Sequence, residues 1–188
     1  AKGISMKSPE ELQQLRDHGL GIVYLGLESG DAATLKAVNK GAGPEKMIEM
    51  GRKIRDAGIK LSVTVLLGLA GRNEAESQRH AKETGRVLSA MDPDYVGALS
   101  LMLIPGTPLH NEYEAGRFEL PGATEMLSEL RTMLAHTDLS GGLFHANHAS
   151  NYLPIRARLP EDKEKTLAMI DDALAGRIAL RPEFLRAL

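Results

Sequence analysis

Apolar and polar positions along this chain form two kinds of segment in turn, which predicts alternating helices and strands. Ser8-Pro9-Glu10-Glu11 is typical of a helix start, because a capping serine precedes a proline and two acids, and this helix is expected to end near Gly19. The next segment, residues 21–27, is a continuous apolar run too short for a helix. It is predicted to be a strand buried on both faces, as in a parallel sheet.

The same unit of helix and strand then recurs. Residues 15–20 and 54–59 are similar helix endings, and each precedes an apolar segment. The second strand is expected at residues 60–67, and a third at 95–104 follows a helix predicted over 75–90. Units of about 40 residues with one helix and one buried strand favour right-handed crossovers in a parallel α/β sheet or barrel.

The pattern loosens after the third strand. A helix is predicted at about 119–136, an irregular stretch over 141–159, and a last helix over 160–175. We expect an α/β fold in two parts: a partial TIM-type barrel of about three parallel βα units over residues 1–118, and a helical and irregular C-terminal extension over 119–188 packed on it. Three strands cannot close the usual barrel of eight, so strands missing on the N-terminal side are expected.

Composition and charge exclude several classes of function. The 188 residues include 23 Lys and Arg against 25 Asp and Glu, and this balance creates no strong field for nucleic acid or an anionic membrane. Trp is absent and aromatic residues are 4%, which leaves little for stacking on single strands. No apolar run approaches the roughly 20 residues of a membrane helix. We expect a cytoplasmic protein that acts on a small molecule or another substrate, without nucleic acid or membrane.

Cysteine is absent altogether. Its absence removes disulfides, thiolate zinc sites, cysteine nucleophiles and cysteine-ligated iron–sulfur clusters from what this chain can do alone. His145 and His148 lie three residues apart, but nothing near them in the sequence supplies further ligands, so no metal site is expected. Histidines in such a polar stretch are interpreted as structural or substrate-contacting residues.

Residues that directly follow a strand are the candidates for a binding site, since parallel α/β folds bind ligands at the carboxyl ends of their strands. Glu28 ends the first strand between Gly26 and Gly30, so a ligand could approach the backbone while the carboxylate accepts hydrogen bonds from a diol such as a ribose. The alternative is a salt-bridged or solvated Glu28, with Ser29 or Asp31 capping the next helix. The spacing leaves both interpretations open.

The other two strand ends carry weaker signals. Residues 68–74 place two glycines before a helix, which suits a ligand pressed against the backbone, but a plain turn capped by Asn73 is favoured. Thr107 before Pro108 likewise indicates a helix cap first and a ligand contact second. Lys40 is predicted to lie at a helix ending, with pairing to an anionic ligand group as the alternative. Neither a phosphate loop nor a GxSxG elbow occurs in the chain.

Four motifs in order resemble the second half of the radical S-adenosylmethionine (SAM) core domain. They are Gly26-Leu27-Glu28-Ser29-Gly30, Asn39-Lys40-Gly41, Gly68-Leu69-Ala70-Gly71 and Pro105-Gly106-Thr107-Pro108-Leu109. The resemblance covers residues 24–109 and implies a partial barrel holding roughly the fourth to sixth strands. In that family a Cys-x3-Cys-x2-Cys loop binds a 4Fe-4S cluster, and SAM on the open iron yields a 5'-deoxyadenosyl radical that abstracts hydrogen from the substrate.

The resemblance also implies positions for the ligands. By motif position, Glu28 would meet the ribose hydroxyls of SAM, and the strand around Leu66 would line the adenine. The full set of implied cofactor contacts is Glu28, Ser29, Gly30, Leu66, Gly68, Leu103 and Pro105. The stretch 144–158 resembles an extension beyond the core in some members, where it would help cover the substrate. Candidate substrate contacts in it are His145, Asn147, His148 and Asn151.

Two features depart from the family pattern. The cysteine motif is missing, and Ala70 and Arg72 stand where the subgroup usually has Pro and Glu. We therefore interpret the chain as part of a longer radical SAM iron–sulfur oxidoreductase or lyase, inactive alone, whose missing N-terminal part binds the cluster. The alternatives are a non-redox nucleoside-binding module and a catalytically dead scaffold. An edge left open by missing strands is expected to drive dimerisation of the isolated chain.

Overall fold

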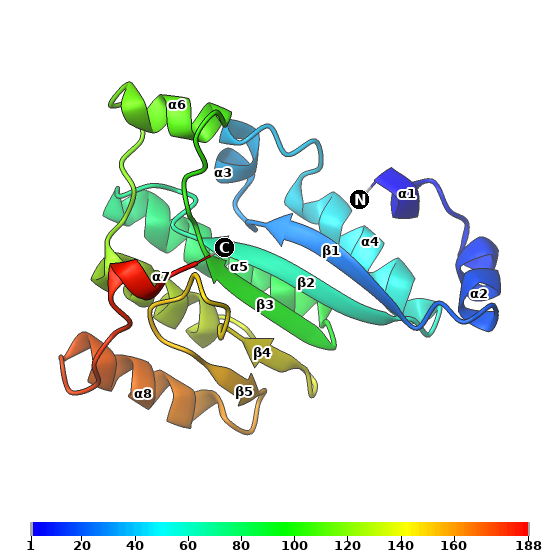
Figure 1. Ribbon diagram of the computed structural model, residues 1–188. Helices are drawn as coiled ribbons and strands as arrows, with labels where there is room; N and C mark the ends of the chain where they lie inside the picture. Colours follow the sequence, from blue (N-terminus) through cyan, green and yellow to red (C-terminus); the bar gives the residue numbers. More distant parts are fainter. Residues whose placement is uncertain (1, 188) are drawn as a thin grey trace.

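The computed structural model describes residues 2–187, and at its centre is one five-stranded sheet in the order β1-β2-β3-β4-β5 (Figure 1). Strands β1 to β4 are parallel, and β5 runs antiparallel to β4. The strands are β1 (Ile22–Glu28), β2 (Lys60–Leu67), β3 (Tyr95–Ser100), β4 (Leu143–His145) and β5 (Arg156–Arg158). The predicted α/β class, built on a parallel sheet, is confirmed.

The longer helices cover one face of this sheet. Helices α4 (Pro44–Asp56), α5 (Glu74–Met91) and α7 (Ala123–Ala135) lie behind it in Figure 1, and α8 (Lys163–Leu174) packs on α7. The remaining helices are α1 (Lys2–Ser5), α2 (Pro9–Asp17), α3 (Ala32–Ala37), α6 (Pro108–Glu114) and the 3-10 turn η1 (Glu183–Leu185). Within residues 2–187, no helix combines the length and the apolar composition needed to cross a membrane.

Local capping signals are used as the sequence indicates. Ser8, Asp31, Asn73 and Thr107 each accept a hydrogen bond from a backbone N–H in the first turn of α2, α3, α5 and α6, respectively. Such a bond satisfies a donor that has no partner within the helix. Of the two capping candidates after β1, the structure uses Asp31.

Two predicted boundaries after β2 are wrong. The third strand ends at Ser100 rather than at residue 104. Leu101 still donates its backbone N–H to the Leu67 carbonyl oxygen, but its side chain joins a second apolar cluster with Leu69 and Met126, against which Leu103 packs. The stretch 141–159, predicted to be irregular, contains β4 and β5. Strands of three residues are too short to show a periodic pattern. Residues after 118 therefore contribute two strands to the sheet as well as helices.

Burial on both faces of the first strand is also a wrong prediction. Leu25 and Leu27 are buried against the helices, whereas Tyr24 on the other face is 74% exposed. The same alternation runs along β2 and β3. One face of the sheet therefore lies under helices, and the other, which we call the open face, is not covered by any helix within residues 2–187.

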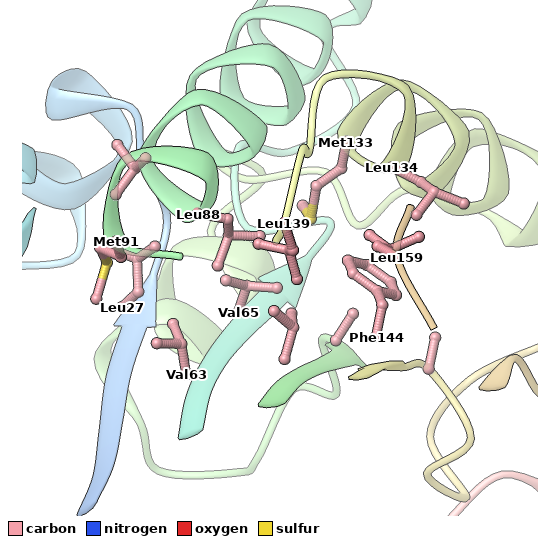
Figure 2. Close-up of a cluster of buried hydrophobic side chains, with 14 of the residues drawn as sticks. Leu27, Val63, Val65, Leu88, Met91, Met133, Leu134, Leu139, Phe144 and Leu159 are labelled. Atoms are coloured by element: carbon pink, nitrogen blue, oxygen red, sulfur yellow. The ribbon is translucent and has the colours of Figure 1, made fainter. Parts of the chain in front are cut away.

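The core lies between the sheet and helices α5 and α7 (Figure 2). Val63 and Val65 of β2 point toward Leu88 of α5, and the cluster continues without a break to Met133 and Phe144. Phe144 belongs to β4, in the segment predicted as an extension, and it is completely buried. The segment after residue 118 thus shares one hydrophobic core with the rest of the chain.

Candidate functional site

The open face carries small and polar residues in rows that cross the strands. Strand register places Gly26, Thr64, Gly97 and His145 side by side on β1, β2, β3 and β4. Since alternate residues of a strand share a face, and the buried residues occupy the positions between these, this row lies on the open face. Two of its four members are glycines, so these positions carry no side chain above the sheet, and we call this row the trough.

Glu28 lies at the β1 end of this trough. The register shifts between Gly26 and Glu28, and Glu28 takes a positive φ of 65°. This irregular turn folds the side chain back over the open face: a Cβ at position 26 would lie 2.4 Å from the Glu28 Oε1 atom. Glycine at position 26 is therefore required for the carboxylate to occupy this place.

Lys40 holds the Glu28 carboxylate in this position. Its Nζ atom donates a hydrogen bond to Glu28 Oε1 at 3.0 Å, and both side chains are about one quarter exposed. Among the described residues, Glu28 Oε2 has no hydrogen-bond partner. Of the two interpretations left open by the sequence, Glu28 is thus salt-bridged, yet it still presents one carboxylate oxygen at the carboxyl edge of the sheet.

Ser29 and Gly30 have structural contacts on the helix side. The Ser29 hydroxyl is fully buried, lies 2.7 Å from His80 Nδ1, and accepts the backbone N–H of Asp31 at 2.9 Å. The Gly30 N–H donates to the Thr84 hydroxyl at 2.8 Å. These bonds join the end of β1 to α5. The cofactor contacts expected of Ser29 and Gly30 stay predictions.

The turn after β2 is held by a buried polar network. Glu129 Oε1 on α7 accepts the backbone N–H of Gly68 at 2.6 Å, and Glu129 Oε2 accepts the hydroxyl of Ser77. The His80 Nε2 atom lies 3.1 Å from the Leu66 carbonyl oxygen and 3.3 Å from Glu129 Oε1. Both His80 and Glu129 are fully buried. The backbone from Leu66 to Gly68, which the resemblance implies to line the cofactor, is thus held on the helix side by His80 and Glu129.

Glu129 is a positioning residue that sequence reasoning missed. It lies on the apolar face of α7, beside Met126 and Leu130, which are both buried. An acid on an otherwise apolar helical face is the signal that could have drawn attention to it, because a buried carboxylate needs hydrogen-bond donors. The sequence alone gave no indication that those donors lie near residue 68.

The third implied loop is less well placed for a ligand. Leu103 packs against the second apolar cluster, and Pro105 is exposed beyond it. The Thr107 hydroxyl donates to the Ile104 carbonyl oxygen at 2.8 Å while it caps α6. This loop is therefore fixed by its own turn, and the contacts expected of Leu103 and Pro105 stay predictions.

Three of the four candidate substrate residues lie together. His145, Asn147 and His148 line a hollow of about 430 Å³ on the open face, whose other lining residues include Tyr24, Ser62, Tyr95, Gly97 and Leu99. Asn151 lies apart and is buried: its side chain donates to the Ala98 carbonyl oxygen at 2.8 Å and accepts the Ser100 hydroxyl at 2.9 Å. Asn151 thus supports the end of β3, and its predicted substrate contact remains without support.

A C-terminal clamp fixes the loop that carries His148. Arg181 Nη1 donates to three carbonyl oxygens of this loop, and Arg186 Nε donates to a fourth, that of Ser150. Arg186 also lies over the Tyr152 ring, 4.1 Å from its centroid. Burial, together with the hydrogen bond to Glu183, raises the pKa of Tyr152 to about 12. The loop is therefore an ordered part of the site.

A larger hollow of about 740 Å³ lies elsewhere, between the loop after β2 and the N-terminal half of α7. Its two arginines are already paired, Arg72 with Glu125 and Arg117 with Glu112. Across residues 2–187, no group of three or more His, Asp or Glu side chains is arranged to hold a metal ion. The open face therefore remains the candidate site.

Comparison with known families identifies a match that includes these residues. The family model described as the Radical SAM superfamily matches residues 1–83, the part that contains Gly26, Glu28, Lys40 and Gly68. This segment is similar to the radical SAM superfamily. The resemblance drawn from the sequence motifs is thereby confirmed for this segment, in a chain that contains no cysteine.

Relatives of the radical SAM segment are much longer than this chain. A tRNA uridine(34) acetyltransferase of Methanocaldococcus infernus is 28% identical over 112 residues, which are 60% of this chain and 21% of that protein. An uncharacterized protein of Methanocaldococcus jannaschii is 29% identical over 114 residues, 61% of this chain and 34% of that protein. The chain thus matches about a third or less of these relatives.

Similarity in fold to solved structures extends beyond residues 1–83. Methanocaldococcus infernus Elp3, with an N-terminal deletion, superimposes with a TM-score of 0.59 at 18% identity, over 92% of this chain and 40% of that one. The radical SAM enzyme coproporphyrinogen III oxidase (HemN) from Escherichia coli gives 0.51 at 16% identity, over 69% of this chain and 29% of that one. The sheet and its helices are thus similar in fold to part of each of these two structures.

Proposed function

We propose that this chain forms the nucleoside-binding half of the SAM site of a radical SAM enzyme, and that polypeptide outside residues 1–188 supplies the cluster. The observation that carries the proposal is the position of the Glu28 carboxylate. It lies over Gly26, its Oε1 atom accepts a hydrogen bond from Lys40 Nζ at 3.0 Å, and its Oε2 atom has no partner among the described residues. A carboxylate at the carboxyl edge of parallel strands, above a glycine, suits the two hydroxyls of a ribose.

The residues present fit one of the two cofactors of the superfamily. A cysteine-ligated 4Fe-4S cluster does not fit, because the chain has no cysteine. SAM fits, since Glu28 offers an acceptor for the ribose and the turn from Leu66 to Gly68 offers a backbone edge fixed by Glu129. In an intact enzyme SAM supplies the radical chemistry. Here Glu28 accepts hydrogen bonds, Lys40 orients Glu28, and His80 and Glu129 position the turn.

The substrate is proposed to lie farther along the trough. Three strand spacings of about 4.8 Å separate β1 from β4, so His145 lies roughly 14 Å across the sheet from the Glu28 end. This span leaves room for a nucleoside and a small substrate side by side. His145, Asn147 and His148 line the β4 side of the hollow of about 430 Å³. We propose them as substrate contacts.

Titration calorimetry tests the SAM site. The chain is titrated with SAM, and Glu28→Ala is expected to weaken binding by about tenfold or more, because a hydrogen bond to a charged group contributes about 1.5–3 kcal/mol. Glu49→Ala is the matched control, since Glu49 is an exposed acid that pairs with Lys46 on the outer surface of α4. Equal affinity of Glu28→Ala and wild type would exclude Glu28 from the site, and absence of binding to the wild type would favour a scaffold.

The open face and the free edge of β1 are proposed to receive further strands. Within residues 2–187, β1 pairs only with β2, and Tyr24 is 74% exposed on the uncovered face. An open edge with apolar surface promotes association. We expect the isolated chain to dimerise in sedimentation velocity as its concentration rises, and Tyr24→Lys to shift it toward monomer. A chain that stays monomeric at every concentration would contradict this expectation.

A further inference from the structure

Arg156 lies at the far end of the trough from Glu28. It begins β5, and the register places it opposite His145 of β4, on the open face. Its side chain is exposed, and no carboxylate of the described residues lies within ion-pair distance of it. With its amide oriented toward Arg156, Asn147 accepts two hydrogen bonds, from Nε at 3.0 Å and from Nη2 at 3.1 Å.

The two hydrogen bonds to Asn147 orient the Arg156 guanidinium without neutralising its charge. Asn147 is uncharged, so it orients Arg156 but leaves its full positive charge. Nη1 and the second hydrogen of Nη2 remain available. A guanidinium fork with two free N–H groups matches the geometry of a carboxylate or a phosphate.

Arg158, two residues along the same strand, has different surroundings. Its Nη1 donates to the Gly141 carbonyl oxygen at 3.1 Å, and it lines a separate hollow that also contains Asp92 and Asp94. Arg55 lines the same hollow and pairs with Asp92 at 2.6 Å, but Asp94 has no ion pair among the described residues, and Asp162 accepts the Arg158 backbone N–H at 2.9 Å. Asp94 and Asp162 disfavour an incoming anion at Arg158, whereas no acid of the described residues lines the hollow of His145 and Asn147. Two arginines on one short strand thus differ in their capacity to bind an anion, which makes Arg158 a matched control.

His145 lies next to Arg156, and its imidazole ring has no hydrogen-bond partner among the described residues. Burial, and then the positive charge of Arg156, lower the pKa of His145 below its ordinary value. The other titratable side chains that line its hollow are Tyr24 on β1, Tyr95 on β3 and His148 in the following loop. An anion bound at Arg156 would offset the charge that acts on His145 and could also accept a hydrogen bond from its ring.

We propose that Arg156, oriented by Asn147 and flanked by His145, binds an oxyanion of the substrate, a phosphate or a carboxylate. The assignment to a substrate rests on the proposed function, whereas the anion site itself does not require SAM. Failure of SAM binding and failure of anion binding are therefore separate results. The proposal assigns an anionic group to the β4–β5 end of the trough, opposite the nucleoside end at β1.

NMR titration of the histidine rings tests this site in the isolated chain. The His145 signal, assigned with a His145→Gln variant, is followed against pH with and without inorganic phosphate, and in a second arm with acetate. A bound oxyanion is expected to raise the titration midpoint of His145 saturably, by on the order of one pH unit, since a nearby negative charge favours the imidazolium form. The anion that saturates at the lower concentration identifies the class.

Two variants make the result specific. Arg156→Gln is expected to raise the His145 midpoint without any anion, because a repelling charge is removed, and to abolish the response to phosphate and acetate. Arg158→Gln is expected to keep that response. An unchanged His145 midpoint with both anions, an equal response in Arg156→Gln, or the same shift from sodium chloride at matched ionic strength would each overturn the proposal.

Discussion

Replacing Phe144 with alanine is expected to lower the free energy of unfolding by about 3–5 kcal/mol. Phe144 is the largest completely buried side chain, and in Figure 2 it lies among Leu134, Leu139 and Leu159. Truncation removes the apolar contacts of the ring and leaves a cavity between β4 and α7 that the close-packed surroundings fill only in part. Urea denaturation followed by circular dichroism measures the change.

The chain offers a matched control for this substitution. Phe184 in η1 is 83% exposed, so Phe184→Ala is expected to change the unfolding free energy by less than about 0.5 kcal/mol. A loss below 1 kcal/mol for Phe144→Ala would mean that the segment after residue 118 does not share the core with β2 and α5. The same outcome would remove the structural basis for placing His145 on the open face, because both residues are fixed by β4.

Glu129→Ala is the second substitution expected to have a large effect, with a loss of about 3 kcal/mol or more. It leaves the buried Gly68 N–H without its acceptor, which costs about 1–3 kcal/mol, and it removes the acceptor of the partly buried Ser77 hydroxyl and the packing of a fully buried side chain. Glu129→Gln is expected to cost less, because an amide oxygen can still accept from Gly68. Urea denaturation gives the stability, and hydrogen exchange at the Gly68 amide reports the local effect.

Exchange at Gly68 separates a local role from a general loss of stability. In Glu129→Gln, the Gly68 amide is expected to exchange faster while amides in the middle of β2 keep their protection. Glu125→Ala on the same helix is the control: Glu125 is partly exposed, pairs with Arg72 and accepts the Gly122 N–H at the start of α7, so its loss is expected to cost about 1–2 kcal/mol without affecting exchange at Gly68. Unchanged exchange at Gly68 in both Glu129 variants would show that Glu129 does not hold this turn.

Local features of the fold follow from the sequence because short-range physics decides them. Strand β2 occupies the predicted residues 60–67, and α5 extends one residue beyond its predicted limits at each end. The caps at Asp31 and Asn73 depend on bonds to residues three positions away. Each of these signals is contained within a single turn or strand, so a pattern of apolar and capping residues is sufficient to find it.

Features that depend on distant residues could not be found in this way. The pairing of β3 with β4 joins Val96 to Phe144, and the support of Gly68 comes from Glu129, 61 residues along the chain. The exposed side of β1 was missed for a similar reason. A largely apolar side chain such as that of Tyr24 predicts burial, whether the residues that would bury it belong to this chain or to another segment. The periodicity of the sequence does not distinguish these two cases.

The candidate site shows the same difference between local features and features that depend on distant residues. The motif around Glu28 predicted an acid at a strand end, and the structure adds the partner that a motif cannot show, the ammonium group of Lys40. Ser29 lies next to Glu28 in the motif, yet its hydroxyl faces His80 on α5. Adjacent residues at a strand end point to opposite faces, so proximity in a motif does not place two side chains in one pocket.

A nitrogen-15 NMR titration of the isolated chain with SAM tests most directly whether the nucleoside binds on the open face. We expect the largest shifts at the amides of Gly26, Glu28 and Leu66, and the loss of these shifts in Glu28→Ala. The opposite result would be shifts confined to the larger hollow between α5 and α7, around Ser77 and Glu125, with no response at β1. That pattern would contradict the assignment of Glu28 to the ribose.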